Sequence, residues 1–397
     1  MKIVMFDFVI HFGGGSQLLA DMVNRLAGLD DVDIEVIDAY GVCEPYHAKL
    51  KEAGVKVHIL LPEDETVWIG YRDKKLIRLW RMLCQIPAFG RLRSRLIRKI
   101  RQINPDVIWS NSSKGLLLLG TSLSLRRYPL AREYIGCPDA ASILRYDRWL
   151  LKHRANVVMA ISTETARQLQ LAGVPGEKIK IVFDTIDMND TLKRSTRPPE
   201  APLPGLEKHP RLLVAGTILR KKGQDTAIKA VARLKSEGLN PTLWLAGDVI
   251  GNDQSYLKYM QDMVAELGVS ENVHFLGWRH DVPAIMNQSE IVIVPSHAEG
   301  FCHVVLEGML LKRPVIATPV GGIKDSIEDG NNGLLFPVGD DKVLAEHIIR
   351  LVSNSSFASM IAENGYRTAT GRFAPEFHTQ KVMEALTQAV RFRTENK

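Results

Sequence analysis

Short apolar runs and amphipathic helical patterns alternate along this chain from its first residues. Runs of four to six apolar residues bounded by polar or glycine positions predict buried strands, and their alternation with helices is typical of a parallel α/β sheet. In the first half the expected strands are residues 3–8, 34–39, 55–60, 107–110, 157–162 and 179–183. In the second half they are residues 212–215, 243–246, 273–276, 291–295 and 315–318.

A proline-rich stretch interrupts this pattern in the middle of the chain. It contains five prolines with few apolar residues between them: Pro198, Pro199, Pro202, Pro204 and Pro210. Such composition is typical of an interdomain linker. We therefore expect a first Rossmann-like domain at residues 1–192, a linker at 193–210 and a second Rossmann-like domain at 211–374. A final helix with a tail is expected at 375–397.

Length and composition support two soluble domains. A chain of 397 residues with 45% hydrophobic and 24% charged residues is too long for one ordinary core. No apolar run is long enough to span a bilayer, and the opening run ends at Asp7, too early for a signal peptide. These features predict a cytoplasmic protein. The four cysteines are widely spaced and indicate neither a disulfide framework nor a zinc site.

The formal net charge of +6 is concentrated in one segment. Residues 72–101 contain eleven Lys or Arg and one acid, Asp73, interleaved with apolar residues at helical spacing. A basic amphipathic helix or helix pair favours an anionic membrane surface or a lipid-diphosphate acceptor. The alternative is a solvated helix whose apolar face turns into the core. Nucleic acid is not expected, because no recognised nucleic-acid module is present.

Two carboxylates, Glu299 and Glu307, stand eight residues apart after a predicted strand. The apolar run that follows Gly300 predicts a helix, so the two acids lie at the carboxyl end of a strand and on the first turns of that helix. Open α/β sheets bind ligands there, and a helix amino terminus favours phosphate. Each glutamate alone is also compatible with ordinary helix capping.

A second basic and glycine-containing element follows the linker. Gly216 and Thr217 close a predicted strand, and Arg220 and Lys222 precede a predicted helix. A lysine and free backbone N–H groups at this position suit the negative charge of a diphosphate. Alternatively, Arg220, Lys221 and Lys222 are ordinary solvated charges, which are common at the start of a helix.

The first strand is followed by a glycine loop, residues 13–15, flanked by His11 and Ser16. Glycines permit close approach of the backbone to a ligand, but the loop is not G-x-G-x-x-G, so a dinucleotide site is weakly indicated. A D-x-D motif that follows a central strand can hold a divalent cation against a diphosphate. The D-x-D sequence Asp31-Val32-Asp33 instead lies in a turn away from any glycine loop. We therefore expect no metal ion at the diphosphate site.

The sequence from Glu299 to Glu307 resembles the E-x7-E signature of the family 4 retaining glycosyltransferases. Residues 216–223 are similar to the family's G-R-L-x-x-x-K-G element, with Thr217 where an arginine is usual. The glycine loop at residues 11–17 resembles its G-G-A-E loop. Two further departures are Asp184-Thr185 in place of Asn-Gly, and the absence of a histidine after the strand at 107–110.

This resemblance implies the GT-B fold, in which two Rossmann-like doubly wound domains face each other across a cleft and the last helix crosses back to the first domain. It implies that Glu299 holds the hydroxyls of the donor sugar, Glu307 holds the ribose, and Lys222 neutralises the diphosphate, so that Glu299 and Lys222 are the catalytic candidates. The donor-binding candidates are Gly14, Gly15, Gly216, Thr217, Arg220, Lys222, Gly277, Trp278, Arg279, Glu299, Gly300, Phe301, Cys302, Val304 and Glu307. The acceptor-side candidates are His11, Ser16 and Asn111.

The expected function is transfer of a sugar from a UDP- or GDP-sugar to a hydroxyl acceptor, with retention of configuration and without a cofactor. The basic segment favours a lipid-linked glycan or another envelope or exopolysaccharide intermediate as acceptor, at the inner face of a membrane. Two alternatives remain open: an NAD-dependent oxidoreductase, and a non-catalytic protein that binds sugar nucleotides.

Overall fold

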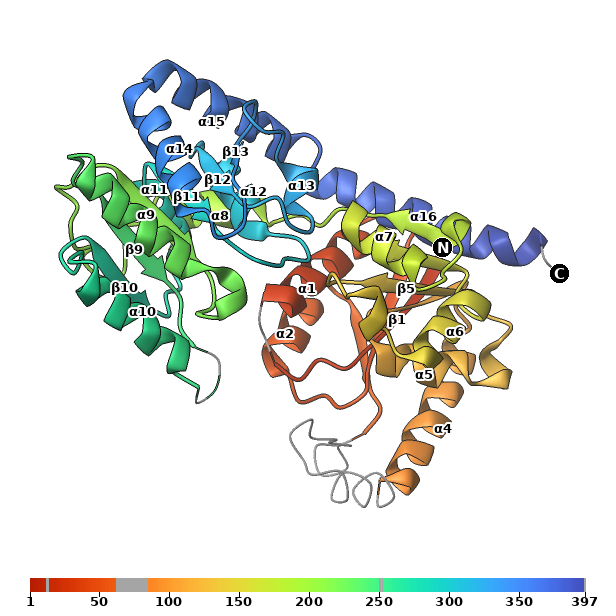
Figure 1. The fold of residues 1–397 in the computed structure, drawn as a ribbon. Coiled ribbons are helices and arrows are strands. Elements are labelled where there is room, and N and C mark those ends of the chain that lie inside the picture. The colour runs from red at the N-terminus through yellow and green to blue at the C-terminus, as the bar shows by residue number, and fades with distance from the viewer. Residues whose placement is uncertain (12–13, 62–84, 250, 252, 396–397) are drawn as a thin grey trace. The chain divides into compact units, whose positions relative to one another are not determined.

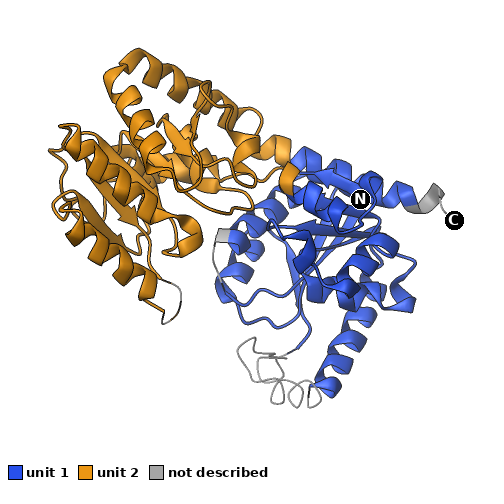
Figure 2. Ribbon diagram, in the orientation of Figure 1, with its two compact units in different colours: residues 1–161, 165–182, 379–397 blue, residues 162–164, 183–378 orange. Residues whose placement is uncertain are grey.

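The computed structural model describes residues 1–11, 14–61, 85–249, 251 and 253–395 of the chain. The contacts divide the chain into two compact units (Figure 1, Figure 2). Unit 1 contains Met1–Ile161, Thr165–Val182 and the chain from Thr379, whereas unit 2 contains Ser162–Glu164 and Phe183–His378. The main division therefore falls after Val182, ahead of the proline-rich stretch at 193–210.

Unit 1 is built on a seven-stranded parallel sheet with the order β3-β2-β1-β4-β5-β6-β7. Its strands are β1 (Lys2–Asp7), β2 (Asp33–Asp38), β3 (Lys56–Ile59), β4 (Val107–Ser110), β5 (Leu130–Tyr134), β6 (Val157–Ala160) and β7 (Ile179–Ile181). The sequence pattern did not predict β5. Arg132 and Glu133 lie within that strand and are buried, so the strand lacks the apolar run on which the prediction depended.

Helices cover both faces of this sheet. Among the described residues, the α-helices of unit 1 are α1 (Gly14–Ala27), α2 (Glu44–Glu52), α4 (Ile86–Ile103), α5 (Ser113–Gly120), α6 (Arg145–His153) and α7 (Thr163–Leu171), the first two residues of α7 falling in unit 2. Because side chains alternate along a strand, Val4 and Phe6 of β1 join the core formed with α4 to α7. Ile3 and Met5 join the opposite core, formed with α1, α2 and the last helix.

The last helix, α16 (Pro375–Glu395), belongs to both units. It begins in unit 2, and from Thr379 it is part of unit 1 (Figure 2). Val382, Leu386 and Ala389 are fully buried in the core that contains α1 and α2. The chain therefore returns to its first unit at its end, as expected.

Unit 2 is built on a six-stranded parallel sheet with the order β10-β9-β8-β11-β12-β13. Its strands are β8 (Arg211–Ala215), β9 (Thr242–Ala246), β10 (Val273–Gly277), β11 (Ile291–Val294), β12 (Val315–Ala317) and β13 (Leu334–Leu335). Its α-helices are α8 (Met188–Ser195), α9 (Gln224–Ser236), α10 (Ser255–Glu266), α11 (Val282–Gln288), α12 (His303–Leu310), α13 (Ile323–Ser326), α14 (Asp341–Ser353) and α15 (Ser355–Thr370). The two-residue strand β13 was not predicted.

Both sheets have the strand order of a doubly wound Rossmann-like fold, so the expected α/β class is confirmed. In unit 1 the order reverses between β1 and β4, and in unit 2 it reverses between β8 and β11. Ligands of such sheets bind at the carboxyl ends of the strands beside this reversal. Each unit therefore offers one favoured position for a ligand.

Candidate active site

Lys222 and Glu299 form an ion pair at the strand reversal of unit 2. Lys222 Nζ lies 2.6 Å from Glu299 Oε1, and the side chains are 25% and 10% exposed. The Ser296 hydroxyl donates a second hydrogen bond, 2.7 Å long, to the same oxygen. Lys222 follows β8 in the short 3-10 helix η5 (Arg220–Lys222), and Glu299 follows β11. The two catalytic candidates from the sequence are thus brought together.

The loop that carries Lys222 is tied directly to the loop that carries Glu299. The backbone N–H of His297 donates to Lys221 O at 2.7 Å. Gly223 then turns the chain into α9 with φ +64°, and a Cβ there would lie 2.1 Å from Pro295 O. A larger residue cannot fit so close to the backbone. Glycine at 223 therefore allows the approach that places Lys222 beside Glu299.

A second glycine turn supports Glu299 from the other side. Gly321 has φ +52°, and a Cβ there would lie 1.8 Å from Glu299 O. The N–H of Gly322 donates to Gly300 O at 3.0 Å. The turn after β12 thus fixes the backbone at Glu299 and Gly300, which explains the glycine pair at 321 and 322 in physical terms.

A partly buried ionic cluster lies around the first turn of α12. His303 Nε2 is 2.9 Å from Asp184 Oδ2. Burial opposes the charge of each group, but the attraction between them prevails, lowering the pKa of Asp184 and raising the pKa of His303. Burial also raises the pKa of Glu307, which His303 and Arg194 only partly offset. Glu307 is therefore held in a partly desolvated position.

Two donor-side candidates between these acids are packed residues. Phe301 is 7% exposed, and its ring lies 5.6 Å from that of Phe373. Cys302 is 5% exposed, and burial raises the pKa of its thiol to about 12. Since the thiolate is the reactive form, Cys302 is not a nucleophile at neutral pH. Gly300 and Val304 complete the segment from Glu299 to Glu307 and are both partly exposed.

The residues before Lys222 have distinct environments. Gly216 has φ +142°, and Thr217 O accepts a 2.9 Å hydrogen bond from the Gln224 side chain. The Arg220 guanidinium lies 5.2 Å from the ring centres of both Tyr256 and Tyr259 on α10. Arg220 is therefore directed toward α10 and engaged in cation–π contacts.

The three candidates after β10 differ in their exposure. Gly277 has φ +66° with open space around its Cα. Trp278 is 68% exposed. Arg279 forms two hydrogen bonds with the Asp281 carboxylate, and that carboxylate also accepts the Glu200 N–H at 2.6 Å. Arg279 is thus fixed by the chain at 200–201, whereas the indole of Trp278 is accessible for stacking.

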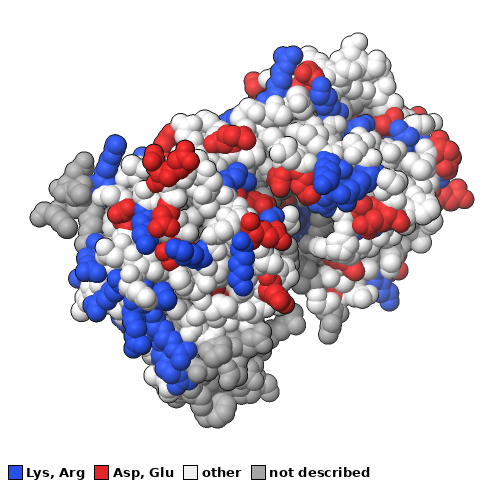
Figure 3. Space-filling view, turned by 180° about the vertical axis from the view of Figure 1, so that it is seen from behind, with Lys and Arg blue, Asp and Glu red and all other residues white. Residues whose placement is uncertain are grey.

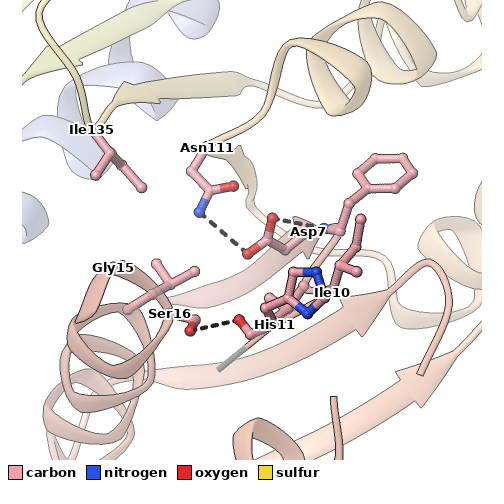
Figure 4. A pocket seen from close by; sticks show the side chains of 10 residues that line it. Asp7, Ile10, His11, Gly15, Ser16, Asn111 and Ile135 are labelled. Carbon is pink, nitrogen blue, oxygen red and sulfur yellow. Dashed lines mark hydrogen bonds between the residues drawn. The ribbon is translucent and has the colours of Figure 1, made fainter. Parts of the chain in front are cut away.

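Unit 1 has its own pocket at the strand reversal between β1 and β4 (Figure 4). Its volume is about 380 Å³. It is lined by Asp7, Phe8, Val9, Ile10, His11, Gly15, Ser16, Leu19, Asn111 and Ile135. The three acceptor-side candidates are therefore neighbours, and the Ser16 hydroxyl donates to His11 O at 3.1 Å. Gly14 is the first residue of α1.

Sequence reasoning missed three polar side chains that the structure brings to these sites. Asp7 ends β1 and accepts a 3.2 Å hydrogen bond from the Asn111 side chain. Ser296 binds Glu299, and His303 binds Asp184. Ser296 follows the predicted strand at 291–295 and His303 lies at the start of the predicted helix, and those positions were the available signal. Asp7 lies inside the predicted strand at 3–8, so its position gave no such signal.

The described part of the basic segment is α4, since residues 72–84 lie outside the described residues. Leu92, Leu96 and Ile100 face the core of unit 1, whereas Arg98 and Arg101 are exposed. Figure 3 shows Lys and Arg side chains gathered at the lower left, where α4 falls in that view. The apolar face of α4 is therefore occupied by the core. Among the described residues, no helix is both long enough and apolar enough to cross a membrane.

Two family descriptions match the chain. Residues 46–190 match Glycosyltransferase Family 4, and residues 201–368 match Glycosyl transferases group 1. The structure is similar to that of Anabaena Alr3699/HepE in complex with UDP, with a TM-score of 0.78 and 22% identity over 98% of this chain and 100% of that chain. The protein belongs to the family 4 glycosyltransferases, and its fold is GT-B.

Curated relatives match over shorter stretches. The lipopolysaccharide core biosynthesis glycosyltransferase LpsE of Rhizobium meliloti is 32% identical over 45% of this chain and 49% of its own length. The D-inositol 3-phosphate glycosyltransferase of Stackebrandtia nassauensis is 33% identical over 37% of this chain and 35% of its own length. The matches therefore span about half or less of these relatives.

Proposed function

We propose that the protein transfers a sugar from a nucleoside-diphosphate sugar to a hydroxyl acceptor, with retention of configuration and without a metal ion. The Lys222–Glu299 ion pair beside the strand reversal of unit 2 is the observation that carries this proposal. UDP-sugars are the favoured donors, since the similar Anabaena protein was solved with UDP and with UDP-glucose. The names of LpsE and other relatives favour a lipopolysaccharide or polysaccharide acceptor.

The ion pair has unused hydrogen-bonding capacity for both parts of a donor. An ammonium group has three donors, and Glu299 takes one of those of Lys222, so two remain for diphosphate oxygens. Glu299 Oε1 accepts from Lys222 and Ser296, which leaves Oε2 to accept from sugar hydroxyls. Glu307, on α12, would accept hydrogen bonds from the ribose hydroxyls. The Lys222–Glu299 pair thereby positions the diphosphate and the sugar, which lie on the two sides of the glycosidic bond that breaks.

Charge develops on the leaving diphosphate as the glycosidic bond breaks, and Lys222 together with the amino terminus of α12 would stabilise it. In the retaining route that we favour, the departing phosphate oxygen takes the proton of the acceptor hydroxyl on the same face of the sugar. This route needs no carboxylate as nucleophile. Glu299 then acts by orienting the donor sugar.

A thermal-shift panel with UDP, GDP, ADP, TDP and NAD, each with Mg²⁺ or with EDTA, tests the donor class. A ligand at a hundred times its dissociation constant stabilises the folded state by about 2.7 kcal/mol. We expect one nucleoside diphosphate to stabilise the protein equally with Mg²⁺ and with EDTA. A response to NAD alone would favour the oxidoreductase, and a strict requirement for Mg²⁺ would contradict metal independence.

The catalytic assignments are tested by Glu299→Gln and Lys222→Met in an assay of sugar transfer. Loss of one preorganised polar contact to the reacting group typically costs about 10²- to 10³-fold in rate. We expect a loss of this size in kcat for both variants, with nucleoside-diphosphate affinity retained in Glu299→Gln. NMR of the product's anomeric proton then distinguishes retention from inversion. Near-normal kcat in both variants would contradict the proposed site and favour a non-catalytic binding role.

We also propose that the basic face of α4 attracts unit 1 to an anionic membrane surface. Since the core occupies the apolar face of this helix, the attraction would be electrostatic rather than insertion of apolar side chains. Such binding weakens as salt screens the charges. Co-sedimentation with vesicles of anionic lipid at low and high salt tests it, and a protein that never sediments with them would contradict it.

A further inference from the structure

The pocket in unit 1 contains a buried carboxylate in its lining. Asp7 is the last residue of β1 and only 5% exposed, yet its side chain lines the pocket (Figure 4). Asn111, the first residue after β4, approaches it from the neighbouring strand of the strand reversal. A carboxylate held at the carboxyl edge of two central strands is placed where such sheets bind ligands.

Hydrogen bonds hold the Asp7 carboxylate in place, but its oxygens can accept further hydrogen bonds. Asp7 Oδ1 accepts the Phe8 N–H at 2.7 Å, and Oδ2 accepts the Asn111 side-chain N–H at 3.2 Å. A carboxylate oxygen can accept two hydrogen bonds, so one further direction remains on each. Because an ionised carboxylate only accepts, the ligand group that meets it must be a donor.

Apolar side chains form much of the remaining wall. Val9 and Leu19 are buried, and Ile10 and Ile135 also line the pocket. In such surroundings the carboxylate gains from a hydrogen-bond donor, whereas it repels an anionic ligand group. The pocket therefore combines this apolar wall with the Asp7 carboxylate and with the polar residues His11, Ser16 and Asn111.

We propose that Asp7, positioned by Asn111, selects the acceptor: it accepts a hydrogen bond from a hydroxyl that lies next to an apolar group, and it excludes acceptors that carry an anion at that position. This inference rests on the proposed glycosyltransferase function, because only a transferase has an acceptor substrate. It adds the chemical character of the acceptor, which that function leaves undefined.

The charged and titratable groups around Asp7 come from several elements. Asp38 at the end of β2 acts on it with negative charge and Arg132 on β5 with positive charge, whereas burial raises the pKa of Tyr46 on α2, so this phenol is neutral. Asp38 is itself bound to His47 on α2 at 2.7 Å, and His11 lies on the pocket wall. Burial, opposed by the Phe8 and Asn111 hydrogen bonds, raises the pKa of Asp7 to about 6. Discrimination against anions is therefore expected to weaken on acidification through pH 6.

Octyl β-D-glucoside and octyl β-D-glucuronide are matched probes, because they share the apolar chain and ring and differ by one carboxylate. We expect the full-length protein to bind the glucoside at least about tenfold more tightly than the glucuronide at about pH 8, a difference of about 1.4 kcal/mol. Asp7→Asn should reduce this ratio to near one. Asp30→Asn, which removes the same charge from an exposed turn of unit 1, should preserve it.

A measurement on the unmodified protein guards against an Asp7→Asn variant that fails to fold. The glucuronide stays ionised at about pH 5, since carboxyl groups of this type titrate near pH 3 to 4. The preference for the glucoside should therefore fall about tenfold between about pH 8 and pH 5 as Asp7 takes up a proton. A ratio that stays constant over this range, or equal binding of both probes at pH 8, would overturn the proposal.

Thermal shifts with UDP separate this inference from the proposed function. UDP should stabilise the unmodified protein and Asp7→Asn to the same extent, because the Lys222–Glu299 site lies in unit 2. Equal shifts together with an unchanged probe ratio would reject the role of Asp7 and leave the function intact. Absence of any nucleoside-diphosphate response in the unmodified protein would instead reject the function, whatever the probe ratio.

Discussion

His303 Nε2 lies 2.9 Å from Asp184 Oδ2, and this pair connects the first residue of α12 to the chain that follows β7. Asp184 stands where the family usually has asparagine. With a histidine as its partner, the aspartate becomes part of an ion pair at the edge of the candidate donor site. In this chain the residue at 184 is therefore an acid paired with a histidine.

We predict that this pair stabilises the protein most strongly in mildly acidic solution. The raised pKa of His303 contributes stability that is complete below the ordinary value of about 6.5 and is lost as the pH rises through the raised value. The lowered pKa of Asp184 contributes stability that is complete above about 3.9 and is lost as the pH falls through the lowered value. Both contributions are therefore complete between about pH 4 and pH 6.5.

The variant His303→Gln keeps a hydrogen-bond donor but removes the charge. We expect it to lower the free energy of unfolding by about 1 to 2 kcal/mol at pH 5.5 and by less at pH 9, as a hydrogen bond between charged groups is replaced by a weaker one. Thermal unfolding across this range measures the difference. Equal destabilisation at both pH values would show that the charge of His303 is not involved.

Glu307→Gln should weaken nucleotide binding while stabilising the free protein. The pKa of Glu307 is raised by burial, so its ionised form costs stability at pH values above that raised pKa, and this cost disappears below about pH 4.5. The glutamine removes the cost at neutral pH. It also removes a charged acceptor for ribose hydroxyls, for which we expect about tenfold weaker nucleotide binding. Calorimetric titration and unfolding at pH 7.5 and 4.5 test both effects, and unchanged nucleotide affinity would reject the ribose assignment.

Much of the fold was predictable because its strands are continuously apolar. Residues 291–294 are four β-branched residues that are all buried, and such runs mark central parallel strands. Residues 130–134 lack such an apolar run, because Arg132 and Glu133 are buried within β5, where Arg132 donates to Ser110 O of the neighbouring strand β4. Burial of charge depends on tertiary partners, which a local pattern does not contain.

The candidate site residues were likewise predictable only where the local sequence carried the signal. Glu299 and Lys222 were predictable because each follows a strand beside a glycine turn, and both strands border the strand reversal. Asp7 was not recognised as a candidate, since its importance depends on Asn111, which is 104 residues away in the sequence and reaches it from the adjacent strand. Juxtaposition across a sheet requires the strand order, and spacing along the chain does not supply it.

Gly321→Ala should disrupt the site far more than Gly330→Ala. Both glycines have a left-handed backbone, with φ +52° and +75°, so each substitution carries the strain of about 1 to 2 kcal/mol of a non-glycine residue there. Only at 321 would the new Cβ also collide with Glu299 O, whereas at 330 the space is open. We expect Gly330→Ala to lose stability alone and Gly321→Ala to lose at least about a hundredfold in kcat as well. Comparable kcat values in two folded variants would reject the supporting role of the 321 turn.

Reversal of two exposed charges on α4 should weaken attachment to anionic vesicles without affecting nucleotide binding. Each Lys or Arg near an anionic surface contributes about 1 kcal/mol, so Arg98→Glu with Arg101→Glu should weaken binding by more than about tenfold. Lys193→Glu with Lys258→Glu makes the same change in net charge on exposed positions of unit 2 and serves as the control. Vesicle co-sedimentation at low salt measures the binding, and the UDP thermal shift reports on the donor site. An equal loss in both double variants would mean that net charge, rather than the α4 face, determines the attachment.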